Sequence, residues 1–235
     1  MIELSARLRS ADWPEKPVRL QVRHRFSGVM NLVGPDEKRY TLLTRHIDFQ
    51  PRSLLCASLP AHDATGEEQY SFPPVEVGFD PELRLPFPNP RWKGMWTEWP
   101  TLETGLSPEE VEKGVQLPES LLGRGEGFTP AGDDLLSGML TSLLWLDPVL
   151  AERKFLRVEP MLHNTGWFSR QMLLDTMHGC TWKRGKDLCM ALCDTDAARL
   201  LESVASILQW GHRSGAAWLA GLGVGLCLAD AHNGG

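Results

Sequence analysis

The sequence predicts an α+β fold, in which a strand-rich N-terminal part is followed by an all-helical C-terminal bundle. Before residue 90, short runs alternate apolar and polar residues, as half-buried strands do. After Thr104, apolar residues recur at helical spacing and capping residues precede the runs. We therefore expect a small or barrel-like sheet and then a bundle of helices joined by short loops.

The strands are expected in the first part of the chain. The run VRLQVRHRF alternates apolar and mostly basic residues, which indicates a strand with one exposed face. The turn residues GPDEK favour a hairpin between the next two strands. The expected strands are residues 18–26, 28–33, 40–47, 53–59 and 75–79.

The first expected helix has a clear start and a clear stop. Ser107 suits the N-cap, Pro108 the first helical position and Glu110 the third, while Pro118 ends the helix after about residue 116. The other expected helices are residues 135–146, 147–162, 169–178, 186–193, 196–210 and 214–229.

A proline-rich stretch followed by RWKGMWTEWP indicates a domain boundary. The prediction is a strand-rich domain over 1–90, a Trp/Pro-rich linker over 91–104 and a helical domain over 105–235. Three tryptophans of the linker are spaced to share one face of a helical turn. We expect them to pack the linker onto the body; the alternative is a surface that stacks a ligand. They are Trp92, Trp96 and Trp99.

Composition excludes several classes of protein. The formal net charge of −6 argues against a nucleic-acid binder, which would present a basic face. The N-terminus does not resemble a signal peptide. The longest apolar run, residues 216–229, predicts a buried helix and no membrane span. The five cysteines form no CxxC pair, and we expect reduced thiols in a cytoplasmic protein.

The most informative stretch is GRGEGFTPAGDDLLSG, residues 123–138. Its alternating glycines allow positive φ and a close approach to a ligand. The stretch leads into a helix, whose start favours an anion. The expected contacts to a phosphate or oxyanion are the N–H groups of Gly125 and Gly127 and the hydroxyl of Thr129.

Two adjacent aspartates complicate this anion site. Asp133 and Asp134 point about 100° apart on a helix, so they cannot share one role. We expect one of them to hold a divalent metal such as Mg²⁺ or to accept a proton, and the other to cap or brace the loop. The alternative is a tight connection into a buried helix, with both aspartates on the surface of its first turn.

The loop has an internal echo near the C-terminus. PAGDDLLSGML from Pro130 aligns with RSGAAWLAGLG from Arg213, and the glycines and small residues coincide. Unless this is coincidence, two helices approach closely at their N-terminal ends and bring Asp133, Asp134, His212 and Ser214 into one neighbourhood. His212 and Ser214 then orient a substrate carboxylate or amide. Equally, Ser214 is an N-cap and His212 bonds a carbonyl.

Three segments in this order resemble the AllH-type subunit family of oxamate carbamoyltransferase, which acts in allantoin breakdown. They are GFTPAGDDLLSG, NTGWFSRQMLL and GHRSGAAWLAGL, and the resemblance covers about residues 123–226. Ala131 departs from the family pattern, which has Ser there, and Arg124 and Glu126 add charge to the loop. The resemblance adds site residues beyond those named above: Gly132, Thr165, Ser169 and Gly215.

The resemblance implies carbamoyl transfer, in which oxalurate and phosphate give oxamate and carbamoyl phosphate, or a related reaction of a small ureido acid. It implies phosphate contacts from the loop, proton or metal handling by Asp133 or Asp134, a catalytic role for His212, and other subunits as partners. The alternative is a non-catalytic structural or ligand-sensing subunit whose partner chain carries the chemistry. A kinase using Mg-ATP is a weaker alternative, because the loop lacks a lysine.

Overall fold

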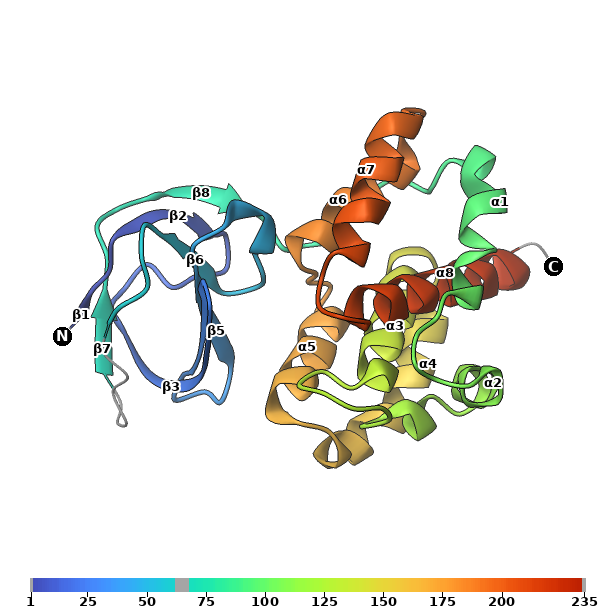
Figure 1. Ribbon diagram of the computed structural model, residues 1–235, viewed down its shortest axis with the longest axis horizontal. Helices are drawn as coiled ribbons and strands as arrows, with labels where there is room; N and C mark the ends of the chain where they lie inside the picture. The colour runs from blue at the N-terminus through green and yellow to red at the C-terminus, as the bar shows by residue number, and fades with distance from the viewer. Residues whose placement is uncertain (1, 62–67, 234–235) are drawn as a thin grey trace. The chain divides into compact units, whose positions relative to one another are not determined.

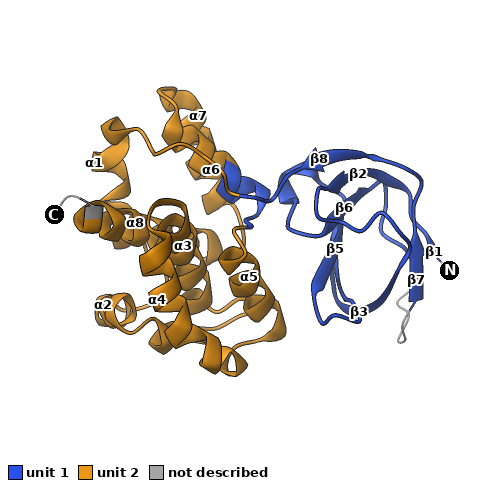
Figure 2. Ribbon diagram, turned by 180° about the vertical axis from the view of Figure 1, so that it is seen from behind, with its two compact units in different colours: residues 1–82, 180–186 blue, residues 83–179, 187–235 orange. Residues whose placement is uncertain are grey.

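The computed structural model of the chain describes residues 2–61 and 68–233 and has the predicted α+β fold. Strands lie in the N-terminal half and helices in the C-terminal half (Figure 1). The chain divides into two compact units, of which unit 1 comprises residues 1–82 and 180–186 (Figure 2). Unit 2 comprises residues 83–179 and 187–235.

Within the described residues, unit 1 holds one mixed sheet of eight strands in the order β1-β7-β3-β4-β5-β6-β2-β8. β3 pairs with β4 and β4 pairs with β5, both antiparallel, whereas the pairs β5–β6, β2–β8 and β1–β7 are parallel. The strands are β1 (Ile2–Glu3), β2 (Ala6–Ser10), β3 (Val18–Phe26), β4 (Val29–Val33), β5 (Arg39–Leu43), β6 (Ser53–Cys56), β7 (Glu68–Ser71) and β8 (Glu76–Phe79).

The alternating run over β3 was a reliable signal, because Leu20 is fully buried while its basic neighbours are exposed. The predicted strand over 40–47 is shorter than expected, since its end forms the 3-10 helix η1 (His46–Asp48). β1, β2 and β7 were not predicted. Two of them are short, and each pairs with a strand far along the chain, so local alternation carries little information about them.

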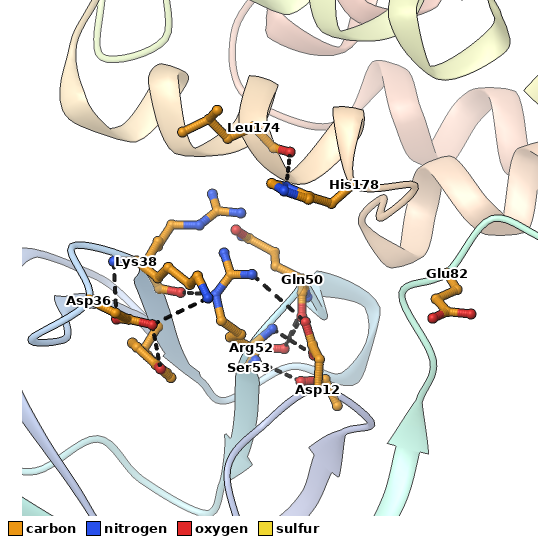
Figure 3. A network of polar contacts seen from close by, with 12 residues as sticks. Asp12, Asp36, Lys38, Gln50, Arg52, Ser53, Glu82, Leu174 and His178 are labelled. Carbon is orange, nitrogen blue, oxygen red and sulfur yellow. Dashed lines mark hydrogen bonds and ion pairs between the residues drawn. The ribbon is translucent and has the colours of Figure 1, made fainter. Parts of the chain in front are cut away.

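A polar network holds the turn that precedes β6 (Figure 3). Arg52 has φ of 51°, a left-handed conformation that is unusual for a residue with a side chain. Its backbone N–H donates to Asp12 Oδ1 at 2.8 Å, and its Nε donates to the Arg39 carbonyl at 2.7 Å. These bonds offset the strain at Arg52 and fix the entry into the buried strand β6.

Residues 180–186 belong to unit 1 although they lie between the two segments of unit 2 in sequence. Arg184 donates to Asp48 at 2.9 Å, and both side chains are buried. Lys186 Nζ donates to the carbonyls of Asp80 and Glu82, at 2.7 and 2.6 Å. A buried ion pair and two backbone contacts therefore bind this segment to the strand-rich part.

Unit 2 contains most of the helices. Its capping-box prediction is confirmed, because Ser107 Oγ accepts from the Glu110 N–H and Glu110 Oε2 accepts from the Ser107 N–H. The helices are α1 (Lys93–Trp96), α2 (Pro108–Gln116), α3 (Ala131–Leu146), α4 (Pro148–Val158), α5 (Trp167–Met177), α6 (Lys183–Cys193), α7 (Ala197–Leu208) and α8 (Ser214–Asn233), with 3-10 helices η2 (Pro90–Trp92), η3 (Trp99–Thr101), η4 (Pro118–Leu121) and η5 (Glu159–Asn164). The first residues of α6 fall in unit 1.

The core of unit 2 is built around α3 and α8. Residues 132–143 of α3 are all buried, although they include two aspartates and three hydroxyl side chains. The three linker tryptophans are buried too, which confirms that they pack the linker onto the body. Gly223 of α8 makes room for them, since a Cβ at this position would lie 2.7 Å from the Trp96 carbonyl oxygen and 2.9 Å from Trp99 Cβ.

Two further expectations concern α8 and the cysteines. The helix is longer than predicted, and Ser214–His232 is long and apolar enough to cross a membrane by length and composition alone. Because 67% of that stretch is buried inside the protein, it has the character of a core helix. None of the five cysteines, which all lie in the described residues, is part of a disulfide.

Candidate functional site

The two echoing segments form the starts of α3 and α8, and these helices pack together in parallel. Ser214 lies beside Thr129 at the start of the pair, and Gly225 lies against Ser142 further along. A Cβ on Gly138 would lie 2.0 Å from the Trp218 carbonyl oxygen. The predicted close approach of the two helices is therefore confirmed.

The packing has approximate two-fold symmetry. Gly221 is the counterpart of Gly138 in the echo, and Leu135 is the counterpart of Trp218. A Cβ on Gly221 would lie 1.9 Å from the Leu135 carbonyl oxygen, which mirrors the contact of Gly138 with Trp218. The echo thus encodes a symmetric helix crossing that holds both helix starts together.

The glycine loop adopts the predicted conformation. Gly123, Gly125 and Gly127 have φ of 69°, 98° and 104°. A Cβ on Gly123 would lie 2.5 Å from the Asn164 carbonyl oxygen, whereas a Cβ on Gly127 would meet nothing within 4 Å. Glycine is therefore required at residue 123 for packing as well as for φ, and at residue 127 for φ alone.

Three backbone N–H groups in the first turn of α3 already have acceptors within the protein. The N–H of Gly132 donates to the Arg124 carbonyl, and those of Asp133 and Asp134 donate to the Pro130 carbonyl. In the part of the chain that the structure describes, the N–H groups of Gly125 and Gly127 have no acceptor. Both glycines are exposed, so these two donors are open to a ligand.

Asp133 braces the loop. Its Oδ1 accepts from the Gly123 N–H at 2.8 Å, and its Oδ2 accepts from the Thr165 hydroxyl. Burial raises the pKa of the Asp133 carboxyl, although the Gly123 N–H and the hydroxyls of Thr165 and Ser169 oppose that rise. Asp133 thus connects the loop, the start of α3 and the segment that precedes α5.

Asp134 is buried as completely as Asp133 but is not bonded in the same way. Its exposed fraction is 0%, and within the described residues neither carboxylate oxygen has a hydrogen-bond partner of normal geometry. The hydroxyls of Thr129 and Ser214 act on this carboxyl as hydrogen-bonding groups, and they lie 2.9 Å from each other. The complete burial of both aspartates excludes their placement on the surface of the first turn.

The electrostatics of Asp134 follow from this burial. Burial raises the pKa of its carboxyl well above the ordinary value, and the negative charge of Asp133 adds to the rise. The Ser214 and Thr129 hydroxyls act in the opposite direction but do not outweigh burial. The balance favours a neutral, protonated Asp134.

Replacing Asp134 with Asn, which carries no charge at any pH, is expected to stabilise the protein near neutral pH by on the order of 1 kcal/mol for each pH unit above about 4, because the folded chain no longer has to hold a proton that the unfolded carboxyl would release. Because the pKa of Asp134 is higher in the folded than in the unfolded chain, its contribution to stability is lost as pH rises from about 4 toward the folded pKa. The advantage of Asn should therefore grow with pH across this window. Urea unfolding of both proteins at several pH values measures it, and a constant difference would contradict the neutral carboxyl.

The other predicted site residues are divided between the cluster and its surroundings. Thr165 and Ser169 lie near Asp133, and Ser169 is fully buried. The two helix-start glycines are packing residues, since a Cβ on Gly132 would lie 2.1 Å from the Leu121 carbonyl oxygen and one on Gly215 would lie 2.0 Å from that of Ile207. His212 is exposed, and no described hydrogen bond or ion pair joins it to the cluster.

Two contacts of the site were not anticipated from the sequence. Phe128 of the loop packs on Phe168 of α5, with ring centroids 4.9 Å apart. Arg213, next to Ser214, pairs with Glu103 at 3.5 Å and thereby contacts the segment before α2. An aromatic residue among glycines was the available signal for the first contact; nothing local indicated the second.

No metal centre is evident in the described part of the chain, where no three His, Cys, Asp or Glu residues form a group that could hold an ion. The oxygens of Asp133 are already acceptors for Gly123 and Thr165. The expectation of Mg²⁺ at Asp133 or Asp134 stays a prediction.

Residues 121–226 match the family model of oxamate carbamoyltransferase subunit AllH. This range contains the glycine loop, the α5 segment and the start of α8, and it supports the resemblance seen in the sequence. No curated protein and no solved structure matched the chain.

Proposed function

We propose that this chain, which resembles oxamate carbamoyltransferase subunit AllH over residues 121–226, is a subunit of a carbamoyltransferase that acts on oxamate, oxalurate or a related small ureido acid. Its glycine loop binds inorganic phosphate or the phosphate of carbamoyl phosphate. The ligand is thus a small anion, and other subunits of the enzyme are the partners.

The observation that carries this proposal is a set of hydrogen-bond donors in and beside the glycine loop. The residues Gly125 and Gly127 are exposed, and their N–H groups have no acceptor in the described structure. Thr129 lies two residues after Gly127, and its hydroxyl is hydrogen-bonded to that of Ser214 at 2.9 Å. Backbone N–H groups and hydroxyls are common phosphate ligands at glycine-rich loops. Arg124, exposed in the same loop, adds a positive charge nearby.

The donors also suit the chemistry of carbamoyl transfer. The reaction requires a held phosphate and stabilisation of the oxygen that gains charge when the carbamoyl carbon is attacked. Fixed N–H groups and hydroxyls supply such stabilisation without a large rearrangement. In this proposal Asp133 holds the loop in place, and Asp134 sets the direction of the hydroxyl hydrogens of Thr129 and Ser214. His212, on the exposed turn before Ser214, orients the substrate.

A second candidate function is a non-catalytic, ligand-sensing subunit. It is favoured by the position of His212, which was expected to have a catalytic role but has no described bond to the cluster. In this case the loop still binds the anion, but the reacting groups belong to a partner chain. Carbamoyl transfer assayed with the chain alone and then with the other subunits separates the two candidates, because a sensing subunit has no activity by itself and a His212→Ala change leaves the assembled activity intact.

Calorimetric titration of the full chain with phosphate, carbamoyl phosphate and oxamate, with and without Mg²⁺, tests the anion site. We expect phosphate and carbamoyl phosphate to bind, and Gly127→Ala to weaken that binding at least tenfold. The reason is that residue 127 has φ of 104°, which a side chain disfavours, while its surroundings are open. Gly166→Ala is the matched control, because residue 166 also has open surroundings but an ordinary φ of −62°. Absence of heat with every ligand would contradict the proposal.

A further inference from the structure

Asp134 is more deeply buried than the two hydroxyl residues that act on it, Thr129 and Ser214. The carboxyl is fully buried, whereas Thr129 and Ser214 are half-buried at the start of their helices. Both hydroxyls influence the Asp134 carboxyl, and they are hydrogen-bonded to each other at 2.9 Å. A ligand at the loop therefore meets the hydroxyls first, and Asp134 acts through them.

The number of hydrogens in this cluster is limited. Each hydroxyl has one hydrogen to donate, and the bond between Thr129 and Ser214 uses one of the two. The remaining hydrogen has two possible directions. It points inward if Asp134 is a carboxylate that must accept, and it is released to point outward if Asp134 itself donates to the pair.

The surroundings of Asp134 favour a protonated carboxyl that donates to the hydroxyl pair. The ionisable group that acts on it is Asp133, whose negative charge opposes a second carboxylate. Other ionisable groups on the neighbouring segments are exposed, or are partly or fully buried on α5 beside α3. The exposed ones are Arg124 and Glu126 on the loop, His212 and Arg213 before α8, and His178 at the end of α5; Arg170 on α5 is partly buried and Asp175 on α5 is buried. None of them is among the groups that stabilise an Asp134 carboxylate.

We infer that Asp134 is a positioning residue that carries a hydrogen, donates it to the Thr129–Ser214 pair and so directs the free hydroxyl hydrogen toward an oxyanion at the glycine loop. This inference rests on the proposed function, since it concerns the same anion site. It also removes the conflict between an anion site and a nearby aspartate, because a donating carboxyl does not repel the ligand. The ligand class is an oxyanion small enough for the loop, such as phosphate or the phosphate of carbamoyl phosphate.

The test compares Asn and Ala at residue 134 in calorimetric titrations with inorganic phosphate. An Asn side chain still donates from its amide N–H₂ group, so Asp134→Asn should bind phosphate within threefold of the unchanged chain, whereas Asp134→Ala should lose at least tenfold. Thr129→Val and Ser214→Ala each remove one hydroxyl of the pair and keep Asp134. Each should lower the phosphate affinity by a similar factor. Ser142→Ala is the matched control, because it removes a buried hydroxyl from α3 that bonds only the carbonyls of Gly138 and Met139.

The outcomes separate this inference from the proposed function. If the unchanged chain binds phosphate and Asp134→Asn loses as much affinity as Asp134→Ala, a carboxylate or a metal is needed and the inference is wrong. If Asp134→Ala binds phosphate normally, the inference is also wrong, while the anion site stands. If the unchanged chain binds no phosphate or carbamoyl phosphate, the proposed function fails and the inference fails with it. Circular dichroism melting of each variant shows that a loss of affinity is not a loss of fold.

Discussion

Replacing Gly221 with Ala is expected to lower the free energy of unfolding of the helical unit by about 3 kcal/mol or more. The added Cβ would lie 1.9 Å from the carbonyl oxygen of Leu135 and 2.7 Å from its carbonyl carbon. Both atoms belong to the backbone of α3, so no side-chain rotation relieves the overlap, and the two central helices must separate. Because interiors are close-packed, that separation opens gaps along the whole crossing.

Urea unfolding followed by circular dichroism measures this effect, and two variants sharpen it. Gly138→Ala should cost a similar amount, because Gly138 is the symmetric counterpart of Gly221 and its Cβ would lie 2.0 Å from the Trp218 carbonyl oxygen. Gly94→Ala is the matched control in α1, where an added Cβ would meet nothing within 4 Å. It should be neutral or stabilise by up to about 1 kcal/mol. A Gly221→Ala protein as stable as the unchanged chain would refute the close helix crossing.

The crossing also shows how much of the site the sequence could predict. Glycines and small residues repeated in two segments indicated two helices in close contact, and the same alignment placed Ser214 near the glycine loop. Both expectations depend on local pattern and chain geometry alone. The alternating glycines likewise predicted positive φ, because glycine is the residue that adopts positive φ without strain, and all three glycines of the loop have it.

The sequence could not predict whether the two aspartates are exposed or buried. Acidic residues in the first turn of a helix are common on protein surfaces, so the pattern at Asp133 and Asp134 fits exposed as well as buried side chains. Their burial depends on the segments that cover them, which include residues 164–169 and the turn before α8. Such contacts join parts of the chain that no local period connects. The position of His212 outside the cluster has the same origin.

In the strand-rich part, too, some elements could be predicted from the sequence and others could not. β3 was predicted at its observed bounds because its alternation is long and regular. β1 has two residues and pairs with β7, and residues 180–186 join this unit from between two helical segments. Short elements held by distant partners have too few residues for a pattern to stand out.

Replacing Asp133 with Ala is expected to cost about 3 kcal/mol in the free energy of unfolding and to abolish phosphate binding at the loop. The substitution leaves the Gly123 N–H and the Thr165 hydroxyl without their shared acceptor. Gly123 already lies against the Asn164 carbonyl, so the loop and the segment before α5 are expected to move apart together once the carboxylate is removed. Burial of Asp133 reduces the gain from its two bonds, which is why the expected cost is below that of two fully effective charged hydrogen bonds.

Two further variants identify the carboxylate bonds as the cause. Asp133→Asn keeps one acceptor oxygen and should lie between the unchanged chain and Asp133→Ala in both stability and phosphate affinity. Asp196→Ala is the matched control, because Asp196 also accepts backbone N–H groups, from Ala198 and Arg199, but caps the separate helix α7. It should cost about 1 kcal/mol and leave phosphate affinity unchanged. If Asp133→Ala keeps its phosphate affinity, the loop does not depend on the Asp133 carboxylate and the anion contacts must lie elsewhere. If Asp133→Ala loses phosphate affinity while Asp196→Ala does not, the loss comes from the geometry of the loop and not from a general loss of stability.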